Sequence, residues 1–319
     1  MSSNAERDAV PIEARVFEPD RLSVGLVLPL LGKGEIVADF GQQLALAEHA
    51  DALGFRALWV RDVPLNSDAY PDPVGHLDPW VLLGALAART RRIALVSGAV
   101  VLTLRHPLHI AKGAISVSDL SGGRFILGLG SGDRPPEYAA FGQDTEARRD
   151  LFRSHWETVA AALDHPSRVV PDVRADDAPE FYLLPRLPGP VPMMAVGSGG
   201  QSVGWIARHA IGWMTYHRDP DAQRDRYRMW RNAAERWSGG RFRAFGVATR
   251  LELCDRRDEP PVPIHLGYRT GARALVDLLE AMRDAGTHHV AFNLTDSPRP
   301  PREVMEELAR DVLPVMHGS

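Results

Sequence analysis

Residues 92–133 constrain the fold of this chain more than any other stretch. They comprise a β-rich apolar run at 93–102, an amphipathic helical pattern at 108–120 and a second apolar run at 125–129. Strand, helix and strand with short connections predict two parallel strands joined by a right-handed crossover. The second strand leads into GLGSGD, whose small residues allow a ligand to approach the backbone closely.

The same alternation runs along most of the chain and predicts an α/β fold. Strands are expected at 22–30, 55–60, 93–102, 125–129, 191–196, 212–216, 242–254 and 289–294. Helices are expected at 39–53, 79–88, 108–120, 147–163, 203–209, 221–237, 271–285 and 303–316. Strands and helices in strict alternation over this length favour a single (β/α)8 TIM barrel. An open doubly wound sheet is the weaker alternative, because the first strand ends at Pro29 without a glycine loop.

The remaining segments are expected to be irregular. Residues 1–20 are polar and interrupted by proline, which predicts a flexible N-terminal arm ahead of a barrel domain at 21–319. Residues 164–191 are rich in proline and predict a loop excursion over the surface, with a short strand at 180–184.

Composition excludes several classes of protein. The net charge of −4 and the pI near 6.3 provide no basic stripe for nucleic acid. We find no apolar run of membrane-spanning length and no apolar signal-peptide core, so a soluble cytoplasmic protein is expected. Cys254 is the single cysteine, which excludes an internal disulfide and argues against a thiolate metal site. No metal site is predicted.

Ionisable residues follow several of the predicted strands, where a barrel of this kind places its active site. The candidates for catalysis are Arg61, Asp62, Asp133, Arg134 and His217. The alternative interpretation is an arginine–carboxylate network that braces the rim, because charges at strand ends often orient other groups.

The GSGGQS segment at 197–202 leads from a predicted strand into a predicted helix. Its backbone N–H groups and the hydroxyls of Ser198 and Ser202 can converge on an anion at the positive end of a helix dipole. This pattern favours a phosphate-bearing ligand. The alternative is a glycine turn in which a serine caps the helix.

Several motifs together resemble the bacterial luciferase-like monooxygenase family of flavin-binding (β/α)8 barrels. They are GAVVLTLRHPLHIAK and LSGGRFILGLGSGD, with the glycine- and serine-rich loop before WIARHA. The similarity spans about residues 22–316 and is strongest at the third to fifth strands. The segments WVRDVPL, SGDRPPEY, GSGGQS, GWMTYHR and GYRTGARAL are closest to the luciferase-type oxidoreductase subgroup.

This resemblance implies reduced FMN at the barrel mouth. Residues 97–99 match the segment that supports the flavin ring in the family, often through a non-prolyl cis peptide, which here would be Gly98–Ala99. The phosphate loop and the end of the fourth strand match as well. The implied cofactor-binding residues are Ser97, Gly98, Ala99, Gly130, Ser131, Gly197, Ser198, Gly199, Gly200, Gln201, Ser202 and Trp205.

The family also implies a reaction. Arg61 and Asp62 stand where luciferases carry an acidic residue and a histidine, which argues against light-emitting aldehyde oxidation. An FMN-dependent monooxygenase that acts with O2 on a small, largely apolar substrate is expected, with Arg61 or Arg134 available to hold a carboxylate.

Partners and alternatives follow from the same resemblance. A homodimer and a separate flavin reductase are implied as partners. The alternatives are an F420-dependent dehydrogenase or reductase of the same superfamily, an FMN- or NAD(P)H-dependent reductase, and a flavin-binding protein without turnover.

Overall fold

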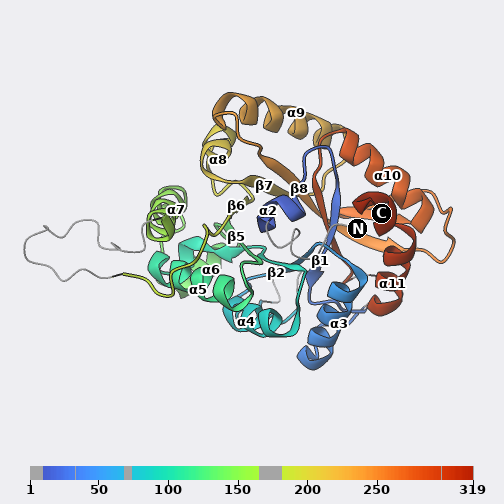
Figure 1. Ribbon diagram of the computed structural model, residues 1–319, viewed down its shortest axis with the longest axis horizontal. Coiled ribbons are helices and arrows are strands. Elements are labelled where there is room, and N and C mark those ends of the chain that lie inside the picture. The colour runs from blue at the N-terminus through green and yellow to red at the C-terminus, as the bar shows by residue number, and fades with distance from the viewer. Residues whose placement is uncertain (1–9, 33, 68–73, 165–181, 296, 319) are drawn as a thin grey trace, which may run out of the picture.

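The computed structural model describes residues 10–32, 34–67, 74–164, 182–295 and 297–318. Eight parallel strands form one sheet in the order β11-β1-β2-β3-β5-β6-β7-β8, and a further pairing of β11 with β8 closes it into a barrel (Figure 1). The strands are β1 (Ser23–Leu28), β2 (Ala57–Val60), β3 (Ala94–Ser97), β5 (Phe125–Gly130), β6 (Met193–Val196), β7 (Gly212–Tyr216), β8 (Ala244–Leu253) and β11 (His289–Asn293). The predicted TIM barrel is confirmed.

Helices surround this barrel and connect successive strands (Figure 1). They are α3 (Phe40–Leu53), α4 (Pro79–Arg89), α5 (Pro107–Leu120), α7 (Arg148–Asp164), α8 (Val203–His209), α9 (Pro220–Trp237), α10 (Ala272–Asp284) and α11 (Pro301–Asp311). Asp39, Asp78 and Asp219 cap the first turns of α3, α4 and α9 through their carboxylates. Within the described ranges, no helix is both long and apolar enough to cross a membrane.

Alternate residues of each strand face two different cores, as the two-residue period of a strand requires. One cluster contains strand residues such as Trp59, Val96 and Met214 and fills the barrel interior. The other cluster contains their neighbours, such as Leu58 and Leu95, packed beneath the surrounding helices. This alternation decides which residues at the strand ends face the barrel mouth.

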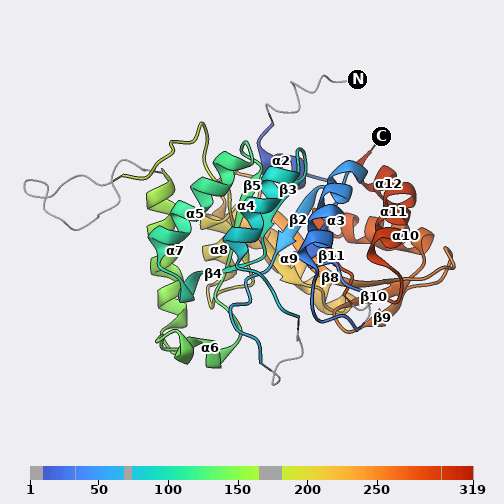
Figure 2. The same ribbon diagram turned by 90° about the horizontal axis from the view of Figure 1, so that it is seen from below.

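The N-terminal segment closes the end of the barrel that lies opposite the carboxyl ends of the strands. Residues 1–9 lie outside the described residues, but α2 (Ile12–Val16) forms a helix where a flexible arm is predicted. Ile12, Val16 and Phe17 are buried against the interior cluster. In Figure 2, α2 lies at one end of the barrel, whereas α6 (Pro135–Ala140) lies at the other. The expectation of a flexible arm therefore fails for residues 12–17, whose apolar side chains plug the barrel.

Other differences from the sequence-based assignment have local causes. The strand expected at 93–102 is divided into β3, β4 (Val100–Val101) and a 3-10 turn, η1 (Leu102–Leu104). The last helix ends at Asp311 and resumes as α12 (Leu313–His317), because Pro314 cannot continue the hydrogen-bond ladder.

Further elements appear where loops are predicted. The short helix α6 begins at two prolines that fit a first helical turn. Strands β9 (Val262–Ile264) and β10 (Gly267–Thr270) form a hairpin at the edge of β8. Residues 180 and 181 lie outside the described residues, and 182–184 form no strand. Most of the predicted excursion also lies outside them.

A polar chain crosses the barrel interior and links the plug to the strands. Trp59 Nε1 donates to His289 Nε2 at 2.9 Å, and His289 Nδ1 lies 2.6 Å from Ser23 Oγ. The Ser23 hydroxyl donates to the carbonyl of Val16 at 2.6 Å, so it can only accept from His289. His289 is therefore neutral, with its proton on Nδ1, and burial lowers the pKa of its ring to about 3.

This chain of hydrogen bonds predicts a pH-dependent stability. An unfolded histidine has a pKa near 6.5, so below about pH 6.5 the unfolded chain binds a proton that His289 in the folded chain does not bind. The stabilising contribution of neutral His289 is complete above that pH and is lost as the pH falls toward 3. In urea denaturation between about pH 7 and pH 5, the His289→Gln variant should lose stability less steeply than wild type, by up to about 1.4 kcal/mol per pH unit. His265→Gln, at an exposed position, is the control, and equal slopes for His289→Gln and wild type would contradict the prediction.

Candidate active site

Three of the segments predicted to bind the cofactor lie side by side at the carboxyl ends of β3, β5 and β6. The Gly98–Ala99 peptide bond is cis, as predicted. A Cβ atom at Gly130 would lie 3.0 Å from the Ala99 Cβ and 3.3 Å from the Val196 carbonyl oxygen. The three segments therefore pack closely through small residues, with Gly98 and Ala99 partly exposed and Gly130 buried.

Ser97 holds this surface together instead of facing a ligand. Its fully buried hydroxyl donates to the Gly128 carbonyl at 2.8 Å and accepts from the Gly128 N–H at 2.9 Å. The carbonyl of Ser131 likewise accepts hydrogen bonds from the hydroxyls of Thr103 and Tyr138. Ser97 thus fixes β3 to β5, and Ser131 ties the next loop to η1 and α6.

The GSGGQS loop has the expected turn geometry. Gly197, Gly199 and Gly200 have positive φ angles of 72°, 55° and 74°, which favour glycine. Ser202 accepts from the N–H of Trp205 and so caps α8, while Trp205 is buried. Within the described residues, the backbone N–H groups of Ser198, Gly199 and Ser202 have no acceptor. Both the anion-binding and the helix-capping interpretations therefore apply to this loop.

Two arginines of α7 lie beside this loop and were not predicted. Arg153 donates twice to the Gln201 side-chain oxygen, at 3.0 and 3.1 Å, while the Gln201 amide donates to the Arg149 carbonyl. A Cβ atom at Gly200 would lie 3.3 Å from the Arg149 side chain. N–H groups without an acceptor, beside two arginine side chains, fit a phosphate. The arginines were missed because they precede the loop by about fifty residues and come from a different helix.

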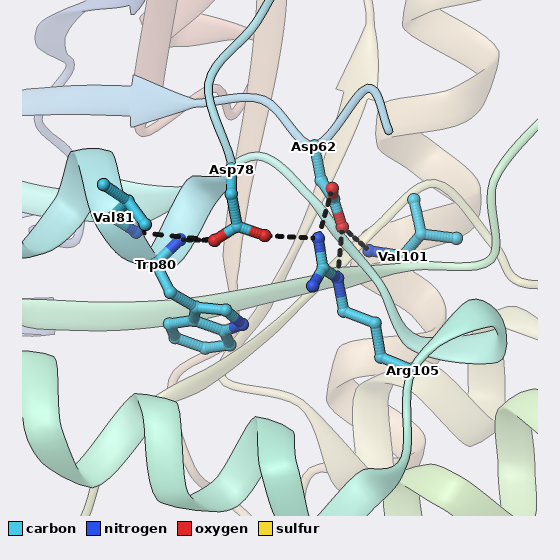
Figure 3. A network of polar contacts seen from close by, with 6 residues as sticks. All are labelled: Asp62, Asp78, Trp80, Val81, Val101 and Arg105. Carbon is cyan, nitrogen blue, oxygen red and sulfur yellow. Dashed lines mark hydrogen bonds and ion pairs between the residues drawn. The ribbon is translucent and has the colours of Figure 1, made fainter. Parts of the chain in front are cut away.

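Asp62 belongs to a network of polar contacts with Val101, Arg105 and Asp78, called here the Asp62 brace, rather than to an open site (Figure 3). Its carboxylate accepts from the Val101 N–H at 3.0 Å and from two nitrogens of Arg105 at 2.9 and 3.0 Å. Arg105 also contacts Asp78 at 3.1 Å, and Asp78 caps α4 through Trp80. This network joins the ends of β2, β4 and α4. It supports the bracing interpretation for Asp62, with Arg105 as the partner.

Arg134 takes part in a second network of polar contacts, with Leu65 and Glu137. It is 7% exposed, and its guanidinium donates to the Leu65 carbonyl at 2.9 Å and lies 3.7 Å from Glu137. Burial raises the pKa of the Glu137 carboxyl, because the loss of water outweighs the Arg134 charge. Asp133 is exposed. Arg134 is therefore poorly placed to hold a substrate carboxylate.

Successive residues of a strand face opposite sides of the sheet, so Arg61 and Asp62 have different surroundings, and so do Tyr216 and His217. His217 comes directly after β7 and has the outward parity. The centroid of its ring lies 4.9 Å from that of Tyr268. The side chain is buried, and burial lowers its pKa to about 4. Tyr216 has the inward parity of Met214 and is 55% exposed at the mouth. Arg61 has the inward parity of Trp59. At the end of β7, Tyr216 rather than the predicted His217 therefore has the inward parity.

A cleft of about 300 Å³ lies next to the Asp62 brace. Its walls include the apolar side chains of Val63, Pro64, Leu104 and Phe141, with Arg105 at its polar side. The cleft is of a size and character that suit part of a small apolar molecule.

The sequence matches the model of the luciferase-like monooxygenase family over residues 21–259, and the chain belongs to this family. An uncharacterized protein of Mycobacterium tuberculosis is 31% identical over 56% of this chain and 68% of the relative. The 4-hydroxyprotoasukamycin monooxygenase of Streptomyces nodosus subsp. asukaensis is 32% identical over 54% of this chain. The F420-dependent hydroxymycolic acid dehydrogenase of M. tuberculosis is 31% identical over 55% of it. The matches span 47% and 49% of these last two relatives.

Solved structures share the fold. An F420-dependent secondary alcohol dehydrogenase has a TM-score of 0.74 at 14% identity, covering 93% of this chain and 99% of that one. The oxygenating constituent of 3,6-diketocamphane monooxygenase of Pseudomonas putida, in complex with FMN, has a TM-score of 0.70 at 16% identity, covering 92% and 98%. Proteins of this fold thus include one solved in complex with FMN and one that depends on F420.

The Asp62 brace predicts unequal costs for two similar substitutions. The Asp62 side chain is 2% exposed and that of Asp78 is 43% exposed. Asp62→Asn turns an N–H donor toward Arg105 or Val101 and should lower the free energy of unfolding by about 2–4 kcal/mol. Asp78→Asn keeps the helix cap and should cost less than about 1 kcal/mol. Urea denaturation measures both values, and equal losses would rule out this description of the brace.

Proposed function

We propose that this chain is an FMN-dependent monooxygenase that oxidises a small organic substrate with O2. The observation that carries the proposal is the placement of Gly98–Ala99, Gly130 and the 197–202 loop at the ends of the adjacent strands β3, β5 and β6. When bound, reduced FMN would supply the electrons for oxygen activation.

The residues of the chain would bind and orient this cofactor. The N–H groups of Ser198, Gly199 and Ser202, with the Ser198 hydroxyl and Arg149, would hold its phosphate. Gly98 and Ala99 are partly exposed and carry no large side chain of their own, so a planar ring could lie against them. Apolar residues of the neighbouring cleft, such as Val63 and Leu104, would keep water from the reacting atoms.

An F420-dependent dehydrogenase is the second candidate. The observation that favours it is the F420-dependent M. tuberculosis relative, whose identity to this chain is close to that of the monooxygenase relative, at 31% against 32%. Homodimer formation, a separate flavin reductase and a cytoplasmic location stay predictions.

Anaerobic titration of the purified apoprotein with reduced FMN and with reduced F420, followed by a pulse of O2, distinguishes the candidates. Tighter binding of FMN and O2 consumption that depends on added organic substrates would support the monooxygenase. Preference for F420 without O2 consumption would select the dehydrogenase. FMN binding without any turnover would favour a binding protein, and binding of neither cofactor would contradict the phosphate site.

A substitution in the loop tests the phosphate site itself. Ser198→Asp places a negative charge among the proposed phosphate donors and should raise the dissociation constant for FMN about tenfold or more, which corresponds to about 1.4 kcal/mol. Asn232→Asp introduces the same charge on the exposed surface of α9 and should leave binding unchanged. Equal effects of the two substitutions on FMN binding, measured by fluorescence, would contradict the proposed phosphate site in the loop.

A further inference from the structure

Arg105, in the Asp62 brace, keeps one guanidinium nitrogen without an acceptor. Its Nε and Nη2 atoms donate to Asp62 at 3.0 and 2.9 Å, and Nη2 also donates to Asp78 at 3.1 Å. Nη1 has no acceptor among the described residues, and Figure 3 shows one nitrogen of this group with no contact drawn. Nη1 therefore has both of its N–H groups left to donate.

The two carboxylates hold this guanidinium in a fixed position beside the cleft. Asp62, Asp78 and Arg105 all line the cleft. Both oxygens of the Asp62 carboxylate are engaged, by Arg105 and by the Val101 N–H, and this side chain is 2% exposed. The Arg105 side chain is 24% exposed, which leaves part of it open to a ligand. A donor fixed in this way loses little conformational freedom when a ligand binds.

The charge of Arg105 is already balanced by these carboxylates. Two carboxylates and one guanidinium line the cleft, so the negative charge of these three side chains exceeds the positive charge. A bound carboxylate would lose its water shell and gain no net attraction from the three together. A bound ammonium carries only donors and offers no acceptor to Nη1. An uncharged acceptor avoids both costs.

The rest of the cleft suits an apolar body. Its other walls include the side chains of Val63, Pro64, Leu77, Leu104 and Phe141. These side chains carry no hydrogen-bonding groups, so an apolar chain can pack against them while its polar end reaches Arg105. The cleft therefore combines apolar walls with a donor whose charge is offset.

We propose that Arg105 determines substrate specificity by donating from Nη1 to an uncharged acceptor oxygen, such as that of a carbonyl, ether or sulfoxide group. This inference rests on the proposed function, because it names the class of molecule that the FMN-dependent reaction would oxidise. The substrate class is thus an uncharged molecule with an apolar body and an acceptor oxygen. Carboxylates and amines of the same size are disfavoured.

Calorimetric titration with 2-octanone, octanoate and octylammonium tests this selection, because the three probes have the same number of carbon atoms and differ in charge. Each is titrated into the FMN-free and the FMN-loaded protein. 2-Octanone should bind at least about tenfold more tightly than either charged probe. Equal or tighter binding of octanoate or octylammonium would overturn the proposal. This comparison needs no variant, so it does not depend on whether a substituted chain folds.

A substitution locates the effect at Arg105. Arg105→Lys keeps a positive charge between Asp62 and Asp78 but removes the directed Nη1 donor, so it should weaken 2-octanone binding about tenfold and leave FMN binding unchanged. Arg89→Lys is the matched control, because Arg89 donates through Nε and Nη2 to Glu48 on the exposed surface, and it should change neither affinity. An unchanged 2-octanone affinity in Arg105→Lys would refute the assignment.

Failure of the substrate assignment and failure of the proposed function give different results. Loss of FMN binding in Arg105→Lys, with 2-octanone binding intact, would assign the guanidinium to the cofactor and overturn the substrate assignment. FMN binding without any preference for 2-octanone would reject the role of Arg105 and leave the monooxygenase standing. Binding of 2-octanone that depends on Arg105, in a protein that binds no FMN, would support the assignment and reject the monooxygenase.

Discussion

The two-residue alternation of a closed barrel governs which groups can act at the mouth. Each strand sends one residue into the interior and the next under the helices, and closure through β8 and β11 removes any other choice. Adjacent residues therefore have different surroundings: Trp59 faces the barrel interior, while Leu58 packs beneath the helices. Tyr216 and His217 divide in the same way.

Close packing of β3 against β5 adds a second constraint. A Cβ atom at Gly128 would lie 1.9 Å from the Ser97 carbonyl oxygen, so only glycine allows the two strands to approach. The Ser97 hydroxyl fixes that approach from its buried side. The close placement of Gly98–Ala99 beside Gly130 follows from this packing, and it is the part of the mouth at which we propose that the cofactor binds.

The sequence predicts the barrel well, because strand and helix periods repeat with short connections and the helix starts carry capping residues such as Asp39 and Asp78. It predicts the site less well. Position after a strand indicates that a residue lies close to the mouth but does not tell whether its side chain faces inward, so His217 was predicted although Tyr216 has the inward parity. Arg153 was missed because it reaches the loop from another helix.

The central claim is that the small-residue segments at the ends of β3, β5 and β6 form the cofactor site. A crystal structure of the chain with FMN tests it most directly. The account predicts the phosphate at the 197–202 loop and the flavin ring over Gly98–Ala99. A phosphate bound away from that loop would contradict the account.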